Sequence, residues 1–213
     1  MFARVELRAQ DLAASRRFYT TVLGALPIAP TEQDADGHGT AWRDFTIVQA
    51  DEGHPPTRGL HIGFSAPGRE AVDAFWEAGV RAGHADDGPP GPRTQYVHDY
   101  YGAFLLDPDG NSAEAVTYSD VRREGAVDHL WIRVADLGAA RDWYAAIAPA
   151  AGWRMRDADA LRVQVERPHG NGSFALVSDE RPLTQHAHLA VAAADPASAG
   201  VQLDPDGNRI ELV

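Results

Sequence analysis

Two histidines and one glutamate in the second half of the 213-residue chain have the residue types and strand positions of a metal site. Polar and apolar residues alternate after His129, so its imidazole lies on the polar face of a strand, opposite the apolar face that packs beneath a helix. The same alternation puts His188 and Glu211 on the polar faces of two later strands. Imidazole and carboxylate ligands suit Fe, Mn, Co, Ni or Zn. We therefore predict a divalent metal (Fe, Mn, Ni or Zn) on His129, His188 and Glu211, with room for substrate and for oxygen or water.

The equivalent positions in the first half of the chain hold Arg4, His61 and Glu114. An arginine stays protonated, cannot ligate and repels a cation. We expect this first-half set to bind no metal, or to bind one only through replacement ligands. It remains a candidate for contact with a substrate.

Side chains near the two sets are candidates for binding a small molecule. Arg133 and Arg209 flank the proposed triad and are suited to an anionic group, although arginines on a half-exposed strand often point into water. A tyrosine-rich segment with one histidine precedes the last strand of the first half, and it either lines the cup or packs an apolar face. The full set of predicted substrate contacts is Arg4, His61, His98, Tyr101, Glu114, Trp131, Arg133 and Arg209.

The composition excludes several classes of function. The formal charge is 19 − 31 = −12, which disfavours nucleic acid and anionic membranes as partners, because phosphates attract a positive surface. The chain has no lysine and no cysteine, which removes Schiff-base chemistry, thiol nucleophiles and thiolate zinc sites. No apolar stretch approaches the length of a membrane span, and the charged, alternating N-terminus does not resemble a signal peptide. We expect a cytoplasmic protein.

Two internal repeats indicate that the chain consists of two related halves. The segment from Arg4 to Ala25 resembles the segment from His129 to Ala150, at an offset of 125 residues. The motif Asp-Pro-Asp-Gly-Asn occurs at residue 107 and again at residue 204, an offset of only 97. The second half has therefore lost about 28 residues. We predict a complete domain over residues 1–119 and a second, shortened domain over residues 126–213.

The periodicity of each half predicts strands alternating with helices, an α+β class. Alternation in residues 4–9 predicts a strand, and Asp11 has the position of an N-cap for the helix that follows. The other expected elements of the first half are strands at 42–50, 60–66, 94–106 and 113–117, a helix at 69–82, a loop at 88–93 and a turn at 107–110. In the second half, residues 193–200 replace a helix by a short connection.

Three stretches of the first half resemble one superfamily. They are the opening pattern Val-Glu-Leu-Arg-x-x-Asp-Leu-x-x-Ser-x-x-Phe-Tyr, the run HIGFSAPGREAVDAFWEAGVRAG and the run YVHDYYGAFLLDPDGNSAEAV. Together they resemble the vicinal oxygen chelate superfamily, which includes glyoxalase I, bleomycin-resistance proteins and type I extradiol dioxygenases. The resemblance covers residues 2–118 well, and residues 127–191 and 202–213 more loosely.

The resemblance implies tandem βαβββ modules that form cupped mixed sheets with helices on the convex side. It also implies that metal ligands come from the first strand of each module and from the final strand. In the second half these positions are His129, His188 and Glu211. In the first half Arg4 departs from the pattern.

The resemblance leaves three functions open. An extradiol dioxygenase would hold iron in its second half, but the histidine and tyrosine that such enzymes use belong to the segment that is shortened before Glu211. A glyoxalase-like isomerase or lyase would use a fourth, glutamate ligand that has no clear counterpart here. A metal-free protein of the bleomycin-resistance type would sequester a small molecule between aromatic side chains. We favour the metal-dependent enzyme, with a small-molecule ligand and a homodimer as expected partners.

Overall fold

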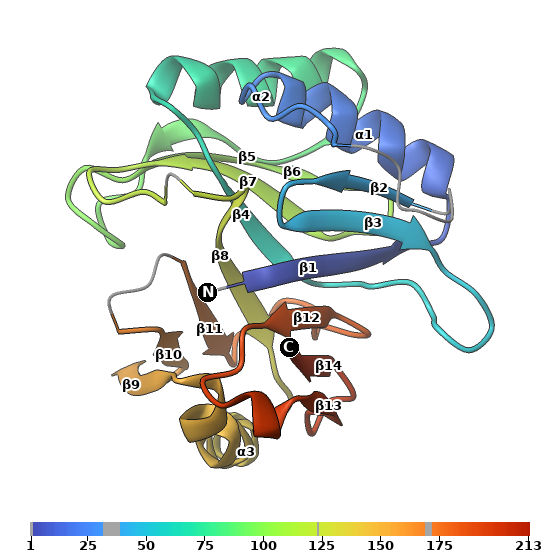
Figure 1. The fold of residues 1–213 in the computed structure, drawn as a ribbon. Coiled ribbons are helices and arrows are strands. Elements are labelled where there is room, and N and C mark those ends of the chain that lie inside the picture. Colours follow the sequence, from blue (N-terminus) through green and yellow to red (C-terminus); the bar gives the residue numbers. More distant parts are fainter. Residues whose placement is uncertain (1, 32–38, 123, 169–171) are drawn as a thin grey trace.

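The computed structural model describes residues 2–31, 39–122, 124–168 and 172–213, which form two mixed sheets and three α-helices (Figure 1). The expected α+β class is confirmed. An eight-stranded sheet has the order β5-β6-β7-β4-β8-β11-β10-β9, and a six-stranded sheet has the order β13-β14-β12-β1-β3-β2. The strands of the larger sheet are β4 (His61–Ser65), β5 (Ala85–Pro92), β6 (Tyr101–Leu106), β7 (Ser112–Thr117), β8 (Val127–Arg133), β9 (Arg154–Asp159), β10 (Arg162–Glu166) and β11 (Ser173–Val177). Those of the smaller sheet are β1 (Phe2–Ala9), β2 (Gly39–Trp42), β3 (Phe45–Gln49), β12 (His188–Val191), β13 (Gly200–Leu203) and β14 (Arg209–Leu212).

Each sheet takes strands from both halves of the sequence. In the larger sheet β4 of the first half pairs antiparallel with β8 of the second, with His61 opposite Trp131. In the smaller sheet β1 pairs antiparallel with β12, with Glu6 opposite His188. Neither sheet therefore corresponds to one half of the sequence. Whether residues 1–119 and 126–213 act as separate domains stays a prediction.

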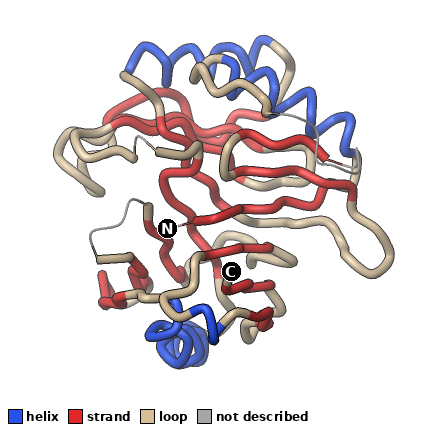
Figure 2. The backbone as a smooth tube through the Cα atoms, viewed as in Figure 1, coloured by secondary structure: helices blue, strands red, loops and turns tan. Residues whose placement is uncertain are grey.

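Helices α1 (Leu12–Gly24) and α2 (Arg69–Arg81) lie together over one side of the sheets, whereas α3 (Leu137–Ala151) lies at the opposite end (Figure 2). The N-cap prediction is confirmed, because the side chain of Asp11 accepts a hydrogen bond from the Ala14 amide. Asp136 caps α3 in the same way, as the repeat requires.

The repeated Asp-Pro-Asp-Gly-Asn turns are tied to the repeated helices. The Tyr19 hydroxyl of α1 donates to Asp107 over 2.9 Å, and the Tyr144 hydroxyl of α3 donates to Asp204 over 3.0 Å. All four side chains are buried. The two sequence repeats therefore correspond to the same local structure, a helix anchored to the turn that precedes the last strand of a module.

Three expected elements differ from the structure. Residues 85–92 form β5 instead of a loop at 88–93, since prolines are tolerated on an edge strand whose register shifts twice. The strand expected at 94–106 begins only at Tyr101, because residues 94–100 form turns. The strand expected at 42–50 is split into β2 and β3 by a turn at Arg43, which has a φ of 58°.

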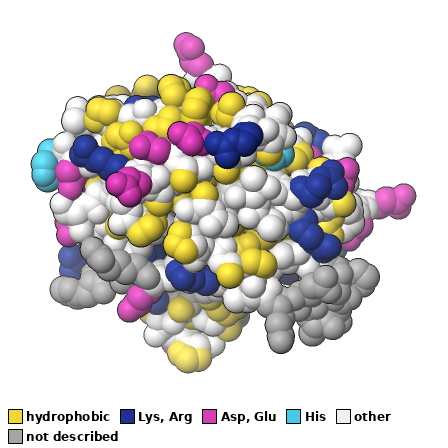
Figure 3. Space-filling model, turned by 90° about the horizontal axis from the view of Figure 1, so that it is seen from above, with side chains coloured by type: hydrophobic (Ala, Val, Ile, Leu, Met, Phe, Trp, Pro, Cys, Tyr) yellow, Lys and Arg dark blue, Asp and Glu magenta, His cyan; other side chains and the backbone are white. Residues whose placement is uncertain are grey.

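The core lies between the sheets and their helices. Large side chains that are fully buried include Phe18 and Tyr19 of α1, Phe45 and Phe64 of the sheets, and Phe75 of α2. On the face above α1 and α2, acidic and basic side chains are interspersed with hydrophobic ones (Figure 3). None of the helices in the described ranges is long and apolar enough to cross a bilayer.

Candidate metal centre

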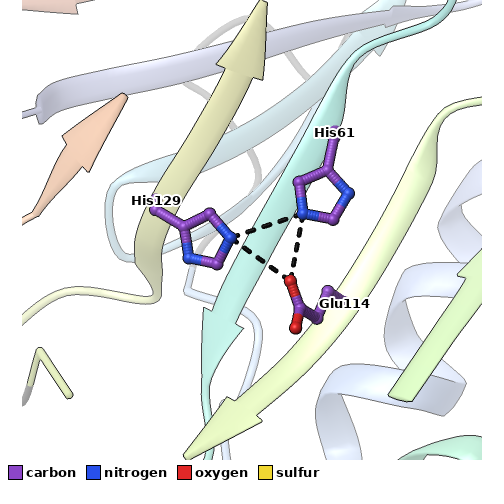
Figure 4. Close-up of side chains that lie close together, drawn as sticks. All are labelled: His61, Glu114 and His129. Atoms are coloured by element: carbon purple, nitrogen blue, oxygen red, sulfur yellow. Dashed lines mark hydrogen bonds and ion pairs between the residues drawn. The ribbon is translucent and has the colours of Figure 1, made fainter. Parts of the chain in front are cut away.

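Three side chains from three adjacent strands of the larger sheet converge on one point (Figure 4). The Nε2 atom of His61 on β4 lies 3.0 Å from the Oε2 atom of Glu114 on β7. The Nε2 atom of His129 on β8 lies 3.2 Å from the same oxygen and 3.3 Å from the His61 nitrogen. The register explains the convergence, because Gly63 of the central strand β4 pairs with Glu114 on one side and with His129 on the other.

The distances between these three atoms fit a single metal ion. Donor atoms bound at about 2.1 Å, at right angles to one another, lie about 3.0 Å apart. The three observed separations lie between 3.0 and 3.3 Å. Two imidazoles and a carboxylate are also a donor set that suits Fe, Mn, Ni and Zn. The three residues therefore fit a divalent metal, although the sequence predicts that metal on His129, His188 and Glu211 instead.

Each histidine is held by its outer ring nitrogen. His129 Nδ1 lies 2.9 Å from the carboxylate of Asp128, and His61 Nδ1 lies 3.1 Å from the hydroxyl of Ser112. Such partners fix the orientation of a ligating imidazole and leave its other nitrogen free to bind. The Asp128 carboxylate is itself held, because it accepts hydrogen bonds from the Tyr118 hydroxyl and the Arg122 amide.

The carboxylate of Glu114 is held in the same manner. The Tyr100 hydroxyl donates to its outer oxygen over 2.7 Å, and the inner oxygen faces both histidines. A side chain at Gly102 would overlap the outer oxygen. A methyl group at Gly63 would likewise overlap the imidazole of His129. Both glycines are therefore required by the close approach of a ligand side chain to a neighbouring strand.

The electrostatics of the three residues favour a positive charge at their centre. Burial opposes ionisation of Glu114, but hydrogen bonds and the charges of the two histidines lower its pKa to about 2. Burial also disfavours a charged His129, but Asp128 and Glu114 raise its pKa to about 10. Burial is the main cause that lowers the pKa of His61, which favours the neutral ring that a metal ligand requires. The site thus holds one cationic group between two acceptors, and a divalent ion would satisfy the same groups.

The larger sheet supplies three candidate ligands but no carboxylate at the position related to Glu114 by the repeat. Glu114 lies two residues beyond Ser112, the residue of β7 that pairs with His61. On β11 the residue that pairs with His129 is Ser173, and two residues beyond it is Ala175. The position that would complete a four-ligand site therefore carries a methyl group.

Two cavities of about 340 and 360 Å³ adjoin the three residues. The first is lined by His61 and Glu114, the second by His129, and Trp131 lines both. Three arginines, Arg93, Arg133 and Arg181, line the first cavity with two aspartates, Asp87 and Asp179.

The predicted grouping of His129, His188 and Glu211 requires a correction. His188 and Glu211 do meet, with 2.8 Å between Nε2 and Oε2, but they do so in the smaller sheet. His129 lies with His61 and Glu114, because β8 pairs with β4 and not with β12 or β14. The sequence repeat assigns each residue to the correct strand. However, each sheet combines a module of the first half with a module of the second half, so residues of one half are divided between the two sheets. Whether any of these side chains binds a metal stays a prediction.

The three first-half residues Arg4, His61 and Glu114 are likewise divided between the two sheets. Arg4 lies in the smaller sheet, where its guanidinium is 3.5 Å from Glu211. The arginine that we expected to repel a cation from His61 and Glu114 is therefore absent from their site.

The other predicted contacts fall in different places. Trp131 and Arg133 line the cavity beside the three residues, whereas Arg209 lines a cavity of the smaller sheet. The side chain of His98 is 85% exposed and lines none of the described cavities at the site. Tyr101 points to α2, where its hydroxyl donates to Asp73, so it does not face the site.

Sequence reasoning did not single out the supporting residues. Asp128 directly precedes a candidate ligand, and Gly63 is an isolated glycine in a strand, which is a signal for close approach of another group. Ser112 carries no comparable signal, because its role depends on strand register. Tyr100 belongs to the tyrosine-rich segment that the sequence placed either in the lining of the cup or against an apolar face, and it lines both cavities.

Comparison with known proteins gives a consistent assignment. A family model, the Glyoxalase/Bleomycin resistance protein/Dioxygenase superfamily, matches residues 2–115. The solved glyoxalase/bleomycin resistance protein from Albidiferax ferrireducens T118 is 36% identical over 55% of this chain and 98% of its own, with a TM-score of 0.49. Glyoxalase I from Zea mays is 16% identical over 100% of this chain and 91% of its own, with a TM-score of 0.60, and shows a shared fold. A search of curated proteins finds no match. Because the family model covers more than half of its residues, the chain belongs to the Glyoxalase/Bleomycin resistance protein/Dioxygenase superfamily.

Proposed function

We propose that the protein is a metal-dependent enzyme of the glyoxalase/dioxygenase type that acts on a small molecule in the cup of the larger sheet. The observation that carries this proposal is the convergence of His61, Glu114 and His129, each held from outside so that one donor atom faces a common point. A divalent ion bound there would stabilise negative charge on a substrate oxygen and, if it is iron(II), would support oxygen chemistry.

The absence of a fourth carboxylate favours the dioxygenase branch. A 2-His-1-carboxylate set is the ligand set of non-haem iron oxygenases, and Ala175 occupies the fourth position here. The shortened segment before Glu211 had argued against this branch. It does not affect the proposed site, because the segment between His61 and Glu114 is of full length and contributes Tyr96 and Tyr100 to the cavity walls.

The first cavity suits a small planar molecule with a negatively charged group. Trp131, Tyr96 and Phe104 supply aromatic walls. Arg133 is buried and paired with Asp179 over 3.0 Å, and Arg181 is paired with Asp87 over 2.8 Å.

One arginine of this cavity has no carboxylate partner among the described residues. Arg93 lines the cavity, and its guanidinium donates hydrogen bonds to the carbonyl oxygens of Pro89 and Pro92. An anionic oxygen of the substrate would give Arg93 a charged partner. In this role the arginines orient the substrate beside the metal-binding residues.

A metal-free binding protein of the bleomycin-resistance type is the second candidate. It is favoured by the pKa of His129, which is raised to about 10. A proton on this ring lets His61, Glu114 and His129 pair their polar atoms with one another without a metal ion. The aromatic and arginine-lined cavity would then sequester a small anionic molecule.

Metal content separates the two candidates. Untagged protein, purified and reconstituted anaerobically with Fe, Mn, Ni or Zn, is measured by plasma mass spectrometry. We expect about one equivalent in the wild type and in the control His188→Ala, and none in His61→Ala or His129→Ala. Loss of metal in His188→Ala alone would contradict the site proposed here. The absence of metal from every preparation would leave the binding protein as the better description.

Two further expectations accompany the proposal. We expect a homodimer and a cytoplasmic location. Light scattering of the full chain at micromolar concentration tests the first, and a monomeric mass would contradict it.

A further inference from the structure

The polar face of the smaller sheet borders a cavity of about 450 Å³ that is rich in basic side chains, and we call this face and its cavity the smaller cup. Arg8 of β1, Arg209 of β14 and His188 of β12 line it, with His54 and His186 at exposed positions. This concentration of basic groups is notable in a chain of net charge −12. No step of the proposed function uses these residues.

The two carboxylates of this cup are already paired. Glu6 lies 2.8 Å from the guanidinium of Arg8, 3.7 Å from that of Arg4 and 3.2 Å from His188 Nδ1. Burial opposes ionisation of Glu6, but His188, Arg8 and Arg4 hold its pKa below the ordinary value. Glu211 lies between His188 Nε2, at 2.8 Å, and Arg4, at 3.5 Å. Neither carboxylate is therefore available to neutralise another cation.

Arg209 is the cation that lacks a partner. It lies on the same face of β14 as Glu211, two residues away, and lines the cavity beside His188. Its Nε atom is buried without a hydrogen bond. Among the arginines in the described ranges that are partly or fully buried, it is the one with neither an ion pair nor a hydrogen bond from its side chain. Partly buried cations are normally paired, because desolvation without compensation is costly.

The charges of the cup sum to +1, since it holds three arginines, Arg4, Arg8 and Arg209, and two carboxylates, Glu6 and Glu211. At its rim His54 is paired with Asp51. We propose that the cup of the smaller sheet is a metal-free binding site for a small organic oxyanion, a carboxylate or a phosphate, held by Arg209 and Arg8. The planar guanidinium offers two parallel donors to either group. The cavity has room for a small organic molecule attached to the anion.

Calorimetric titration of the full chain tests this proposal, with inorganic phosphate and succinate as separate probes at constant ionic strength. We expect saturable binding of at least one probe, and the stronger probe identifies the chemistry of the anion. Arg209→Gln should weaken that binding at least about tenfold, because it removes a charge-assisted pair. The variant should fold, since Arg209 makes no side-chain hydrogen bond that would be lost.

Two controls separate this site from the proposed enzyme site. Arg154→Gln, on the exposed start of β9, should bind the probe like the wild type. His129→Ala removes a proposed metal ligand of the other cup and should also leave probe binding unchanged. Binding of neither probe, or equal affinity in wild type and Arg209→Gln, would overturn the proposal. A loss of probe binding in His129→Ala would show that the probe occupies the larger sheet instead.

Discussion

The two cups are built from equivalent strands but differ at one of the three positions that form the candidate metal site. His61 and His188 occupy the same place on β4 and β12, and Glu114 and Glu211 the same place on β7 and β14. The third position is His129 in the larger sheet. In the smaller sheet it is Arg4, which pairs with β12 as His129 pairs with β4.

The backbone position opposite the third ligand differs as well. Gly63 lies opposite His129, and a methyl group there would overlap the imidazole. Its counterpart opposite Arg4 is Ala190. One cup therefore has both an imidazole and the space for it, whereas the other has a long cation and a methyl group in that space. The candidate metal site therefore depends on a matched pair of residues, a histidine on one strand and a glycine opposite it on the next.

The residues that orient the two histidines in the cup of the larger sheet also differ from their counterparts in the smaller cup. Asp128 holds His129, and its repeat counterpart before Arg4 is Ala3. Ser112 holds His61, and its counterpart beside His188 is Arg209. In the smaller sheet the outer nitrogen of the histidine is held by Glu6 instead. Of the two residues that orient the candidate metal ligands in the larger sheet, one is thus replaced by a neutral alanine and the other by a cationic arginine.

The largest effect is expected from Gly63→Ala. The added methyl group forces the ring of His129 out of the site without removing any donor atom. We expect metal affinity to fall by at least about 100-fold, as for loss of a ligand, while circular dichroism shows a retained fold. Affinity is measured by competition with a chelator. Ala190→Gly in the smaller sheet is the control and should leave it unchanged. Wild-type affinity in Gly63→Ala would refute the matched-pair argument.

The converse change should create a site in the other cup. In a His129→Ala background, which has lost the first centre, Arg4→His together with Ala190→Gly supplies an imidazole and its space opposite His188 and Glu211. We expect about one equivalent of metal, bound more weakly than in the wild type because Ala3 offers no carboxylate to hold the new ring.

The single change Arg4→His in the same background is the critical control. It should bind no metal, because Ala190 still occupies the space of the ring. Equal binding with and without Ala190→Gly would show that the glycine is unimportant.

A smaller effect is expected from Asp128→Asn. The amide keeps the size of the side chain but weakens the hold on His129 Nδ1, so metal affinity should fall about 10- to 100-fold. Chelator competition measures this change. Asp179→Asn, which alters the cavity wall but not a ligand, should retain wild-type metal affinity. An unchanged affinity in Asp128→Asn would mean that the strand register alone orients the ring.

The sequence predicts which residues face a cup but not which residues share one. Alternation placed His129, His188 and Glu211 on polar strand faces, and the structure has each of them there. Periodicity is a local property of a strand, whereas grouping depends on whether β8 pairs with β4 or with β12. That choice is made by contacts between segments far apart in the chain, and no local pattern reports it.

The difference between local signals and long-range pairing also explains which secondary-structure elements were predicted correctly and which were not. Helix α2 was predicted within one residue, since its apolar stripe and its ends are local signals. Residues 85–92 form an edge strand in spite of three prolines and two glycines that normally indicate a loop, because pairing with β6 outweighs their local preference.

The smallest effect is expected where the two halves are most alike, at the repeated turns. Tyr19→Phe and Tyr144→Phe each remove a buried hydroxyl that donates to an aspartate, so each should lower the free energy of unfolding, measured by urea denaturation, by about 1–2 kcal/mol.

For Tyr19→Phe the loss of stability should also depend on pH. Burial, partly offset by hydrogen bonds from Asn111 and Tyr19, raises the pKa of Asp107 to about 6. Its protonated form is therefore favoured by folding, and this contribution to stability is complete below about pH 4 and is lost as the pH rises through 6. The Tyr19 hydroxyl favours the ionised form, so Tyr19→Phe should cost more at pH 7.5 than at pH 4.5. An equal cost at both pH values would mean that Asp107 does not change its protonation state between them.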